Sequence, residues 1–238
     1  MVDEYLQGAG LVPDIDDVTL GEAYEACPAV ERSLIKNCIS FTYALQQTGK
    51  EVQSVSERFS HVGRTVNSER LDWAFFAVDE RIFPLPAVFS AMVLALVAKV
   101  ETLVVYVRGP LSRSFLVGCD LLSIPQIYTS RAEQLVSTLE HVGRGVVVDL
   151  AGLELSPTMM IRPRPENYGV AVDLPENEFV AAYRRLTEHF VPTARHTYLC
   201  YGGKEGSAPV IMADRFLGCW QWDSISYDSF RAVSTIFS

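Results

Sequence analysis

Short apolar runs alternate with longer apolar segments through the middle of the chain. The short runs are rich in β-branched and aromatic residues and predict buried strands over residues 71–78, 102–107, 126–129 and 145–150. The segments between them are apolar nearly all round or at helical spacing and predict helices over residues 84–100, 111–122 and 131–140. Strands and helices that alternate in this way predict a parallel sheet with right-handed crossovers. The expected fold class is therefore α/β, with a Rossmann-like sheet in three layers, because strands that are almost wholly apolar need cover on both faces.

The flanking segments are less regular. Before the sheet, the pattern predicts a helix over 29–50, further helical turns over 52–59 and a polar connection over 61–70. After it, the pattern predicts an extended linker over 161–167, a strand over 169–174, a helix over 176–190, two strands over 196–201 and 208–213 that flank a hairpin turn, and a last helix over 227–237. We therefore expect an N-terminal arm over 1–28, a helix plus the Rossmann-like domain over 29–152, and a small C-terminal α+β part over 153–238 that packs on the domain or extends it.

The net charge of −9 is concentrated at the start of the chain. Residues 1–28 hold seven acidic side chains and no Lys or Arg, whereas the remaining 210 residues hold 22 acidic and 20 basic ones. Nucleic-acid binding is not expected, because phosphate neutralisation needs gathered Lys and Arg side chains. The acidic arm is interpreted as a solvated, partly ordered lead-in. A second interpretation is an arm that docks on a basic patch of a protein partner or of a second copy, so a homodimer stays open.

The cysteines and histidines indicate a reduced, metal-free protein. Five cysteines at irregular spacing, with no C-x-x-C pair, predict free thiols in a cytoplasmic protein. No stretch is apolar over the roughly 20 residues that a membrane helix needs, and residues 1–20 lack the features of a signal peptide, so no membrane association is expected. The four histidines stand at no zinc-binding spacing. We expect no metal site and no stoichiometric zinc.

The residues that begin and end the predicted elements of the sheet region add a family resemblance. Pro84-Leu85-Pro86-Ala87 opens the first predicted helix of the sheet region, Gly109-Pro110 follows the second strand, and Gln126-Ile127-Tyr128 forms the third. Over residues 71–152 this order resembles the first Rossmann-like domain of histidinol dehydrogenase, in the aldehyde/histidinol dehydrogenase superfamily, in a divergent and truncated form. That family has Pro-Leu-Pro-Ser, a Pro-Pro turn and Glu-Ile-Phe at these places. The resemblance implies a cofactor cleft at the carboxyl ends of the strands, where such sheets bind ligands.

Side chains replace the glycines that the family has around that cleft. Asp79-Glu80-Arg81 stands where the family has Pro-Gly-Gly, and Ser130-Arg131 stands where it has Gly-Gly. Glycine lets the backbone approach a cofactor closely, whereas two carboxylates repel a pyrophosphate. The residues expected to line the ligand cleft are Asp79, Glu80, Arg81, Arg108, Ser130 and Arg131. The family's catalytic Glu-His pair and its zinc ligands have no match in this chain.

These departures favour a non-catalytic or repurposed domain of the histidinol dehydrogenase type, with a binding or interaction role. Such a domain would take no cofactor and would hold a small anionic ligand near the arginines, because guanidinium groups bind carboxylates and phosphates with a planar fork of donors. The alternative is an NAD(P)-dependent oxidoreductase with an altered active site. Whether the chain is an enzyme therefore stays open.

Overall fold

The core of the fold is a parallel sheet of five strands. The computed structural model describes residues 2–46, 54–59, 62–164, 170–172, 174–191, 199–201, 210–212 and 217–237. The order of the sheet is β5-β4-β3-β6-β7, and all neighbouring strands are parallel. Its strands are β3 (Trp73–Val78), β4 (Thr102–Val107), β5 (Ile127–Tyr128), β6 (Gly145–Leu150) and β7 (Met160–Ile161). The expected α/β class with a Rossmann-like sheet is confirmed.

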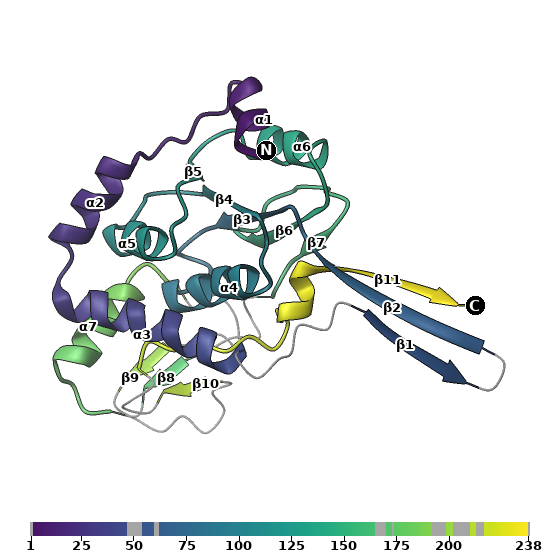
Figure 1. Ribbon diagram of the computed structural model, residues 1–238. Helices are drawn as coiled ribbons and strands as arrows, with labels where there is room; N and C mark the ends of the chain where they lie inside the picture. The colour runs from purple at the N-terminus through teal and green to yellow at the C-terminus, as the bar shows by residue number, and fades with distance from the viewer. Residues whose placement is uncertain are drawn as a thin grey trace.

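Helices cover both faces of this sheet (Figure 1). They are α1 (Val2–Gly8), α2 (Asp17–Ala26), α3 (Ala29–Gln46), α4 (Leu85–Val97), α5 (Arg113–Leu121), α6 (Ala132–Glu140) and α7 (Glu178–Leu186). α4 and α5 pack on one face, and α1 and α6 on the other. α4 is apolar on almost every side because the sheet covers one side and α3 covers the other. Across the described ranges, every helix is too short or too polar to span a bilayer.

The N-terminal arm belongs to the core, so the expectation of a solvated lead-in is wrong. Val2, Leu6 and Leu11 are at most 3% exposed and pack against the sheet face that carries Trp73 and Phe75. The seven acidic side chains of the arm are all exposed. Charge and burial therefore lie on opposite sides of the arm, as in any amphipathic segment that covers a core.

The C-terminal part contains a second, small parallel sheet with the order β10-β8-β9. Its strands are β8 (Val170–Val172), β9 (Leu199–Tyr201) and β10 (Val210–Met212). The predicted strands are confirmed, but the predicted hairpin between the last two is wrong, because β9 and β10 pair with β8 from opposite sides. The predicted linker over 161–167 overlaps β7 at its first residue, and its last three residues lie outside the described part of the chain.

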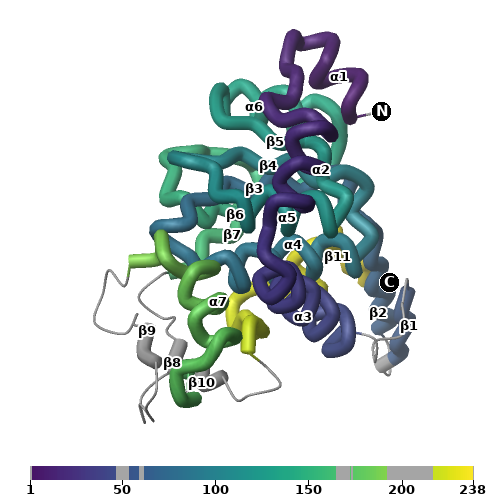
Figure 2. Tube along the Cα trace, turned by 90° about the vertical axis from the view of Figure 1, so that its left-hand side faces the viewer, coloured from purple at the N-terminus to yellow at the C-terminus, as the bar shows by residue number. Residues whose placement is uncertain are grey.

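A third sheet projects from the body of the molecule (Figure 1) and is seen nearly end-on in Figure 2. It is antiparallel, with the order β1-β2-β11, and consists of β1 (Ser54–Phe59), β2 (Val62–Arg70) and β11 (Arg231–Phe237). The predicted helical turns over 52–59, the connection over 61–70 and the helix over 227–237 are therefore wrong. Only residues 227–230 are helical, as a 3₁₀ turn. β-branched residues such as Val66 and Thr235 favour the strands that form instead.

Candidate functional site

The strand order marks one edge of the central sheet as the place for a ligand. From β3 the chain adds β4 and then β5 on one side of the sheet. It then returns to the other side of β3, where it adds β6 and then β7. Doubly wound sheets bind ligands outside the carboxyl ends of the strands where the order reverses in this way. We call the carboxyl ends of β3, β4, β6 and β7, with Asp79, Arg81, Arg108, Asp149 and Arg162, the switch-point edge.

Asp79 and Arg81 form a two-pronged ion pair directly after β3. The Nε and Nη2 groups of Arg81 donate to Oδ1 and Oδ2 of Asp79 at 2.9 and 2.7 Å, and the Arg81 backbone N–H donates to Oδ1 at 3.0 Å. Burial of the Asp79 carboxyl favours its neutral form. The hydrogen bonds and charge of Arg81 outweigh this, so the pKa of Asp79 lies below its usual value. Asp79 is therefore an ionised carboxylate that its neighbour neutralises.

Asp149 and Arg162 form a second neutral pair at the end of β6. The Asp149 side chain is fully buried, whereas that of Arg162 is half exposed. Oδ1 of Asp149 accepts hydrogen bonds from the backbone N–H groups of Ala151 and Leu153, each at 3.1 Å. Oδ2 accepts from Nε of Arg162 at 2.8 Å and again from Leu153 at 3.1 Å. Sequence reasoning missed both residues, although a lone aspartate in an otherwise apolar strand was a usable signal.

Arg108 is the surplus cation of this edge. Its Nη1 group donates to the carbonyl oxygen of Ala151 at 3.2 Å, so the side chain reaches from the end of β4 across β3 to the end of β6. No carboxylate in the described residues lies within ion-pair distance of it. Its charge contributes to the low pKa of Asp79. A Cβ atom at Gly109, whose φ is +102°, would lie 3.6 Å from Nη2 of Arg81, so the Arg81 guanidinium lies beside the chain that follows Arg108.

Glu80 lies at the N-terminus of α5, apart from the Asp79–Arg81 pair. Ser112 caps this helix through a hydrogen bond from the Phe115 N–H to its Oγ, and the Ser112 N–H donates to Oε1 of Glu80 at 3.2 Å. Burial raises the pKa of Glu80 above its usual value, and the bonds from Ser112 only partly offset this. A helix N-terminus is a ready anion site, and here a protein carboxyl group already fills it.

The residues at the start of α4 do not fit the pyrophosphate of a dinucleotide. In sheets of this type, the helix after the first strand of the doubly wound order offers its N–H groups to the phosphates. Pro84 and Pro86 have no N–H group, and the N–H groups of Ala87 and Val88 are bonded to the carbonyl oxygen of Pro84. Leu85 keeps a free N–H at this position but is itself buried. Asp79 and Asp149 at this edge are each paired with an arginine, so neither pair offers a net positive charge to a pyrophosphate.

Ser130 and Arg131 lie after β5, where the structure holds the N-terminal arm. Nη1 of Arg131 donates to the carbonyl oxygen of Gly10 at 3.0 Å. The N–H and hydroxyl groups of Thr129 donate to Oδ2 of Asp14 at 2.7 and 2.9 Å. Of the six residues predicted for the cleft, the structure thus brings Asp79, Arg81 and Arg108 together. The structure places Glu80 at the N-terminus of α5 instead, and it places Ser130 and Arg131 beside the N-terminal arm.

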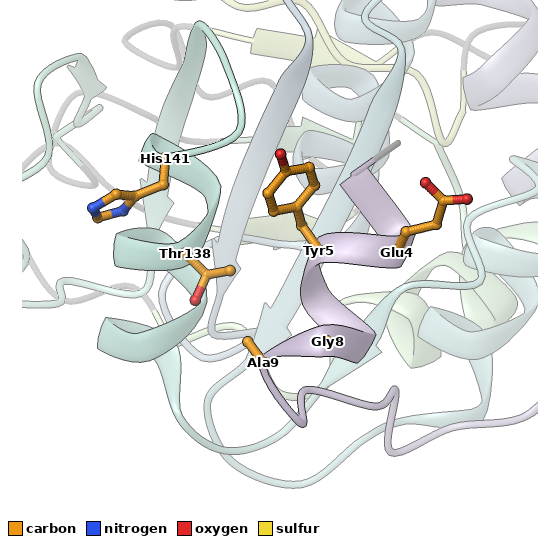
Figure 3. A pocket seen from close by; sticks show the side chains of 6 residues that line it. All are labelled: Glu4, Tyr5, Gly8, Ala9, Thr138 and His141. Atoms are coloured by element: carbon orange, nitrogen blue, oxygen red, sulfur yellow. The ribbon is translucent and has the colours of Figure 1, made fainter.

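A pocket between α1 and α6 is a second candidate (Figure 3). It is lined by Glu4, Tyr5, Gly8, Ala9, Thr138 and His141. The side chains of Glu4 and His141 point away from each other (Figure 3), and Nδ1 of His141 already lies 2.6 Å from the carbonyl oxygen of Ser137. Ligand sites need polar groups that converge on one place. The switch-point edge is therefore the stronger candidate. No set of three His, Cys, Asp or Glu side chains in the described ranges is arranged to hold a metal ion.

Comparison with solved structures shows a distant similarity in fold. Histidinol dehydrogenase from Elizabethkingia anophelis matches 99% of this chain and 79% of its own, with a TM-score of 0.56 and 8% sequence identity. The likeness is one of fold. Two structures of betaine aldehyde dehydrogenase from Staphylococcus aureus in complex with NAD+ match 65% of this chain and 34% of theirs, at 11% identity and TM-scores of 0.36 and 0.37. No family model and no curated protein matches this sequence. The family resemblance given by the sequence is thus confirmed for the fold.

Proposed function

We propose that this chain is a binding domain for a small anion, a phosphate or a small carboxylate, held at the switch-point edge by Arg108. The charge balance of that edge carries the proposal. Arg81 neutralises Asp79, and Arg162 neutralises Asp149. Arg108 lies among these pairs with no carboxylate partner in the described part of the chain. One positive charge is therefore left for a ligand.

The hydrogen-bond donors that Arg108 and Arg81 leave unused also support the proposed anion site. An arginine side chain offers five N–H donors in a planar fork that matches the oxygens of a carboxylate or phosphate. Arg108 uses Nη1 for the carbonyl oxygen of Ala151, which leaves Nε and Nη2. Arg81 binds Asp79 through Nε and Nη2, which leaves its Nη1. Two neighbouring guanidinium groups can thus share one anion.

The charge of the edge limits the size and charge of the ligand. A dinucleotide would bring two phosphate charges to an edge whose carboxylates are already neutralised and which has one guanidinium without a carboxylate partner among the described residues, and α4 offers few N–H groups to compensate. An oxidoreductase that uses NAD is supported by the likeness in fold alone, and a fold does not determine function. A single oxyanion agrees better with one surplus guanidinium.

Calorimetric titration of inorganic phosphate and of acetate, in a low-salt buffer without other multivalent anions, tests the proposal. We expect at least one of these anions to bind with a Kd of about 1 mM or tighter, which is about 4 kcal/mol of binding free energy. Arg108→Gln should weaken this binding at least roughly tenfold, because it removes the surplus charge and keeps most of the side-chain length. Arg58→Gln, on exposed β1, is the matched control and should bind like the unmodified chain. Absence of binding, or equal binding by the two variants, would reject the proposal.

A further inference from the structure

We infer that a hollow where α2 meets the start of α3 is a second binding site, which takes the phosphate monoester of a sugar or of a similar hydroxylated compound (Figure 1). The hollow has a volume of about 370 Å³ and is lined by Tyr24, Ala29, Arg32, Ser33 and Lys36. We call it the α2–α3 hollow. It shares no residue with the switch-point edge, so the inference is independent of the proposed anion site.

Tyr24 holds two basic side chains of α3 in place. The Arg32 guanidinium lies 4.8 Å from the centre of the Tyr24 ring, and its Nη1 group donates to the Tyr24 carbonyl oxygen at 3.1 Å. The Lys36 ammonium lies 5.5 Å from the same ring centre and donates to the Tyr24 hydroxyl oxygen at 3.0 Å. The ring itself packs against the main core. Cations that an aromatic ring already orders lose less entropy when a ligand binds.

Both cations lack a counter-charge. Neither Arg32 nor Lys36 lies within ion-pair distance of a carboxylate in the described part of the chain. Glu31, the nearest carboxylate in the sequence, is buried and is bonded instead to Arg185 and to the Ser114 hydroxyl. Like charges four residues apart on a helix repel each other. An anion with two negative charges would turn this repulsion into attraction.

The hollow offers hydrogen-bond donors and no carboxylate. Arg32 leaves Nε and Nη2 unused, and Lys36 leaves two of its three donors unused. Ser33 adds an exposed hydroxyl group. A phosphate monoester fits such a set, because it carries about −1.5 to −2 charges at pH 7 and accepts through three oxygens. A carboxylate would bring one charge to two cations.

The size and lining of the hollow indicate what the phosphate is attached to. A volume of about 370 Å³ lies within the range of small-molecule sites, roughly 300–1,000 Å³. It exceeds what a phosphate group fills. Four of the five lining residues carry a polar side-chain group, the exception being Ala29. Sugar hydroxyls can bond the hydroxyl groups of Ser33 and Tyr24, whereas an apolar ester group would leave them without partners.

Calorimetric titration of glucose 6-phosphate into the full chain carrying Arg108→Gln tests the inference, because this background lacks the surplus charge of the switch-point edge. Two double variants are compared in it, in low-salt buffer. Arg32→Gln/Lys36→Gln removes both cations of the hollow, and Arg58→Gln/Arg70→Gln removes two exposed cations of the projecting sheet. Lys36→Gln alone keeps the bond from Arg32 to α2, so it gives a reading even if the double variant melts early.

We expect glucose 6-phosphate to bind the Arg108→Gln chain with a Kd of about 1 mM or tighter. Arg32→Gln/Lys36→Gln should weaken binding at least roughly tenfold, Lys36→Gln at least roughly threefold, and the control pair less than about twofold. Glucose 6-sulfate has one charge on the same sugar and should bind at least roughly threefold more weakly. Inorganic phosphate, which lacks the sugar, should bind this hollow at least roughly tenfold more weakly.

Three results would overturn the inference. Absence of binding in the Arg108→Gln chain would place any binding by the unmodified chain at the switch-point edge alone. Equal weakening by the two double variants would show a response to net charge rather than to the hollow. Equal affinity for glucose 6-phosphate and for the sulfate or inorganic phosphate would contradict a site for a sugar phosphate monoester.

Discussion

Removal of residues 1–12 is expected to lower the free energy of unfolding by about 5 kcal/mol or more. Val2, Leu6 and Leu11 in this stretch are almost fully buried against the face of Trp73 and Phe75. Each such side chain contributes roughly 1.5–3 kcal/mol when it leaves water, and the aromatic face beneath them would become exposed as well. Because domains are stable by only about 5–15 kcal/mol, the shortened chain should melt far below the full chain or aggregate. Calorimetric melting measures the difference.

Two point variants separate burial from chain length in this region. Leu6→Ala should cost about 2–5 kcal/mol, the usual range for a truncated core leucine. Tyr5→Ala changes the neighbouring residue of α1, which is 54% exposed, and should stay within about 0.5 kcal/mol. A shortened chain that melted cooperatively within a few degrees of the full chain would contradict the assignment of the arm to the core, since about 1 kcal/mol shifts the melting temperature of a domain this large by 2–4 °C.

Asp149→Ala is expected to destabilise the protein by about 2–5 kcal/mol, because it leaves two backbone N–H groups without their charged acceptor, at roughly 1–3 kcal/mol each. Asp149 is fully buried and holds the turn after β6 through the N–H groups of Ala151 and Leu153. The substitution also removes the ion pair between Asp149 and Arg162. Urea unfolding measures the change, with the slope checked to be constant.

Controls in the same turn make this result specific. Asp149→Asn keeps one acceptor oxygen but loses the charge, so it should lie between the parent and Asp149→Ala. Glu154→Ala removes an exposed carboxylate nearby and should change stability by no more than about 0.5 kcal/mol. If Asp149→Ala unfolded at the same urea concentration as the parent, the turn that anchors the Ala151 carbonyl beneath Arg108 would not depend on this carboxylate.

The central sheet could be predicted because its strands are buried on both faces. The predicted strands over 102–107 and 145–150 agree residue for residue with β4 and β6, since an apolar run between turn residues has few other interpretations. The projecting sheet could not be predicted in the same way. Its strands expose both faces, and Gly63 and Asn67 in β2 are residues that usually mark a connection. The buried positions of the arm, Val2 and Leu6, were hidden by the acidic residues around them.

The candidate site was predictable only where it follows directly from a strand end. Asp79, Arg81 and Arg108 come immediately after predicted strands, so their place at the carboxyl edge followed from the topology. Arg162 could not be placed, because Arg-Pro-Arg-Pro indicates an extended linker and β7 contributes only two residues to the sheet. The contact between Arg131 and Gly10 joins segments far apart in the sequence, and no local pattern indicates it.

Calorimetric titration with NAD tests most directly whether the switch-point edge accepts a single anion and excludes a dinucleotide. The prolines at the start of α4 and the single unpaired charge of Arg108 predict no binding of NAD tighter than about 1 mM in the buffer in which phosphate or acetate binds. Micromolar affinity for NAD would contradict this account. Its loss in Arg108→Gln would then place the dinucleotide at the same edge and favour an oxidoreductase instead.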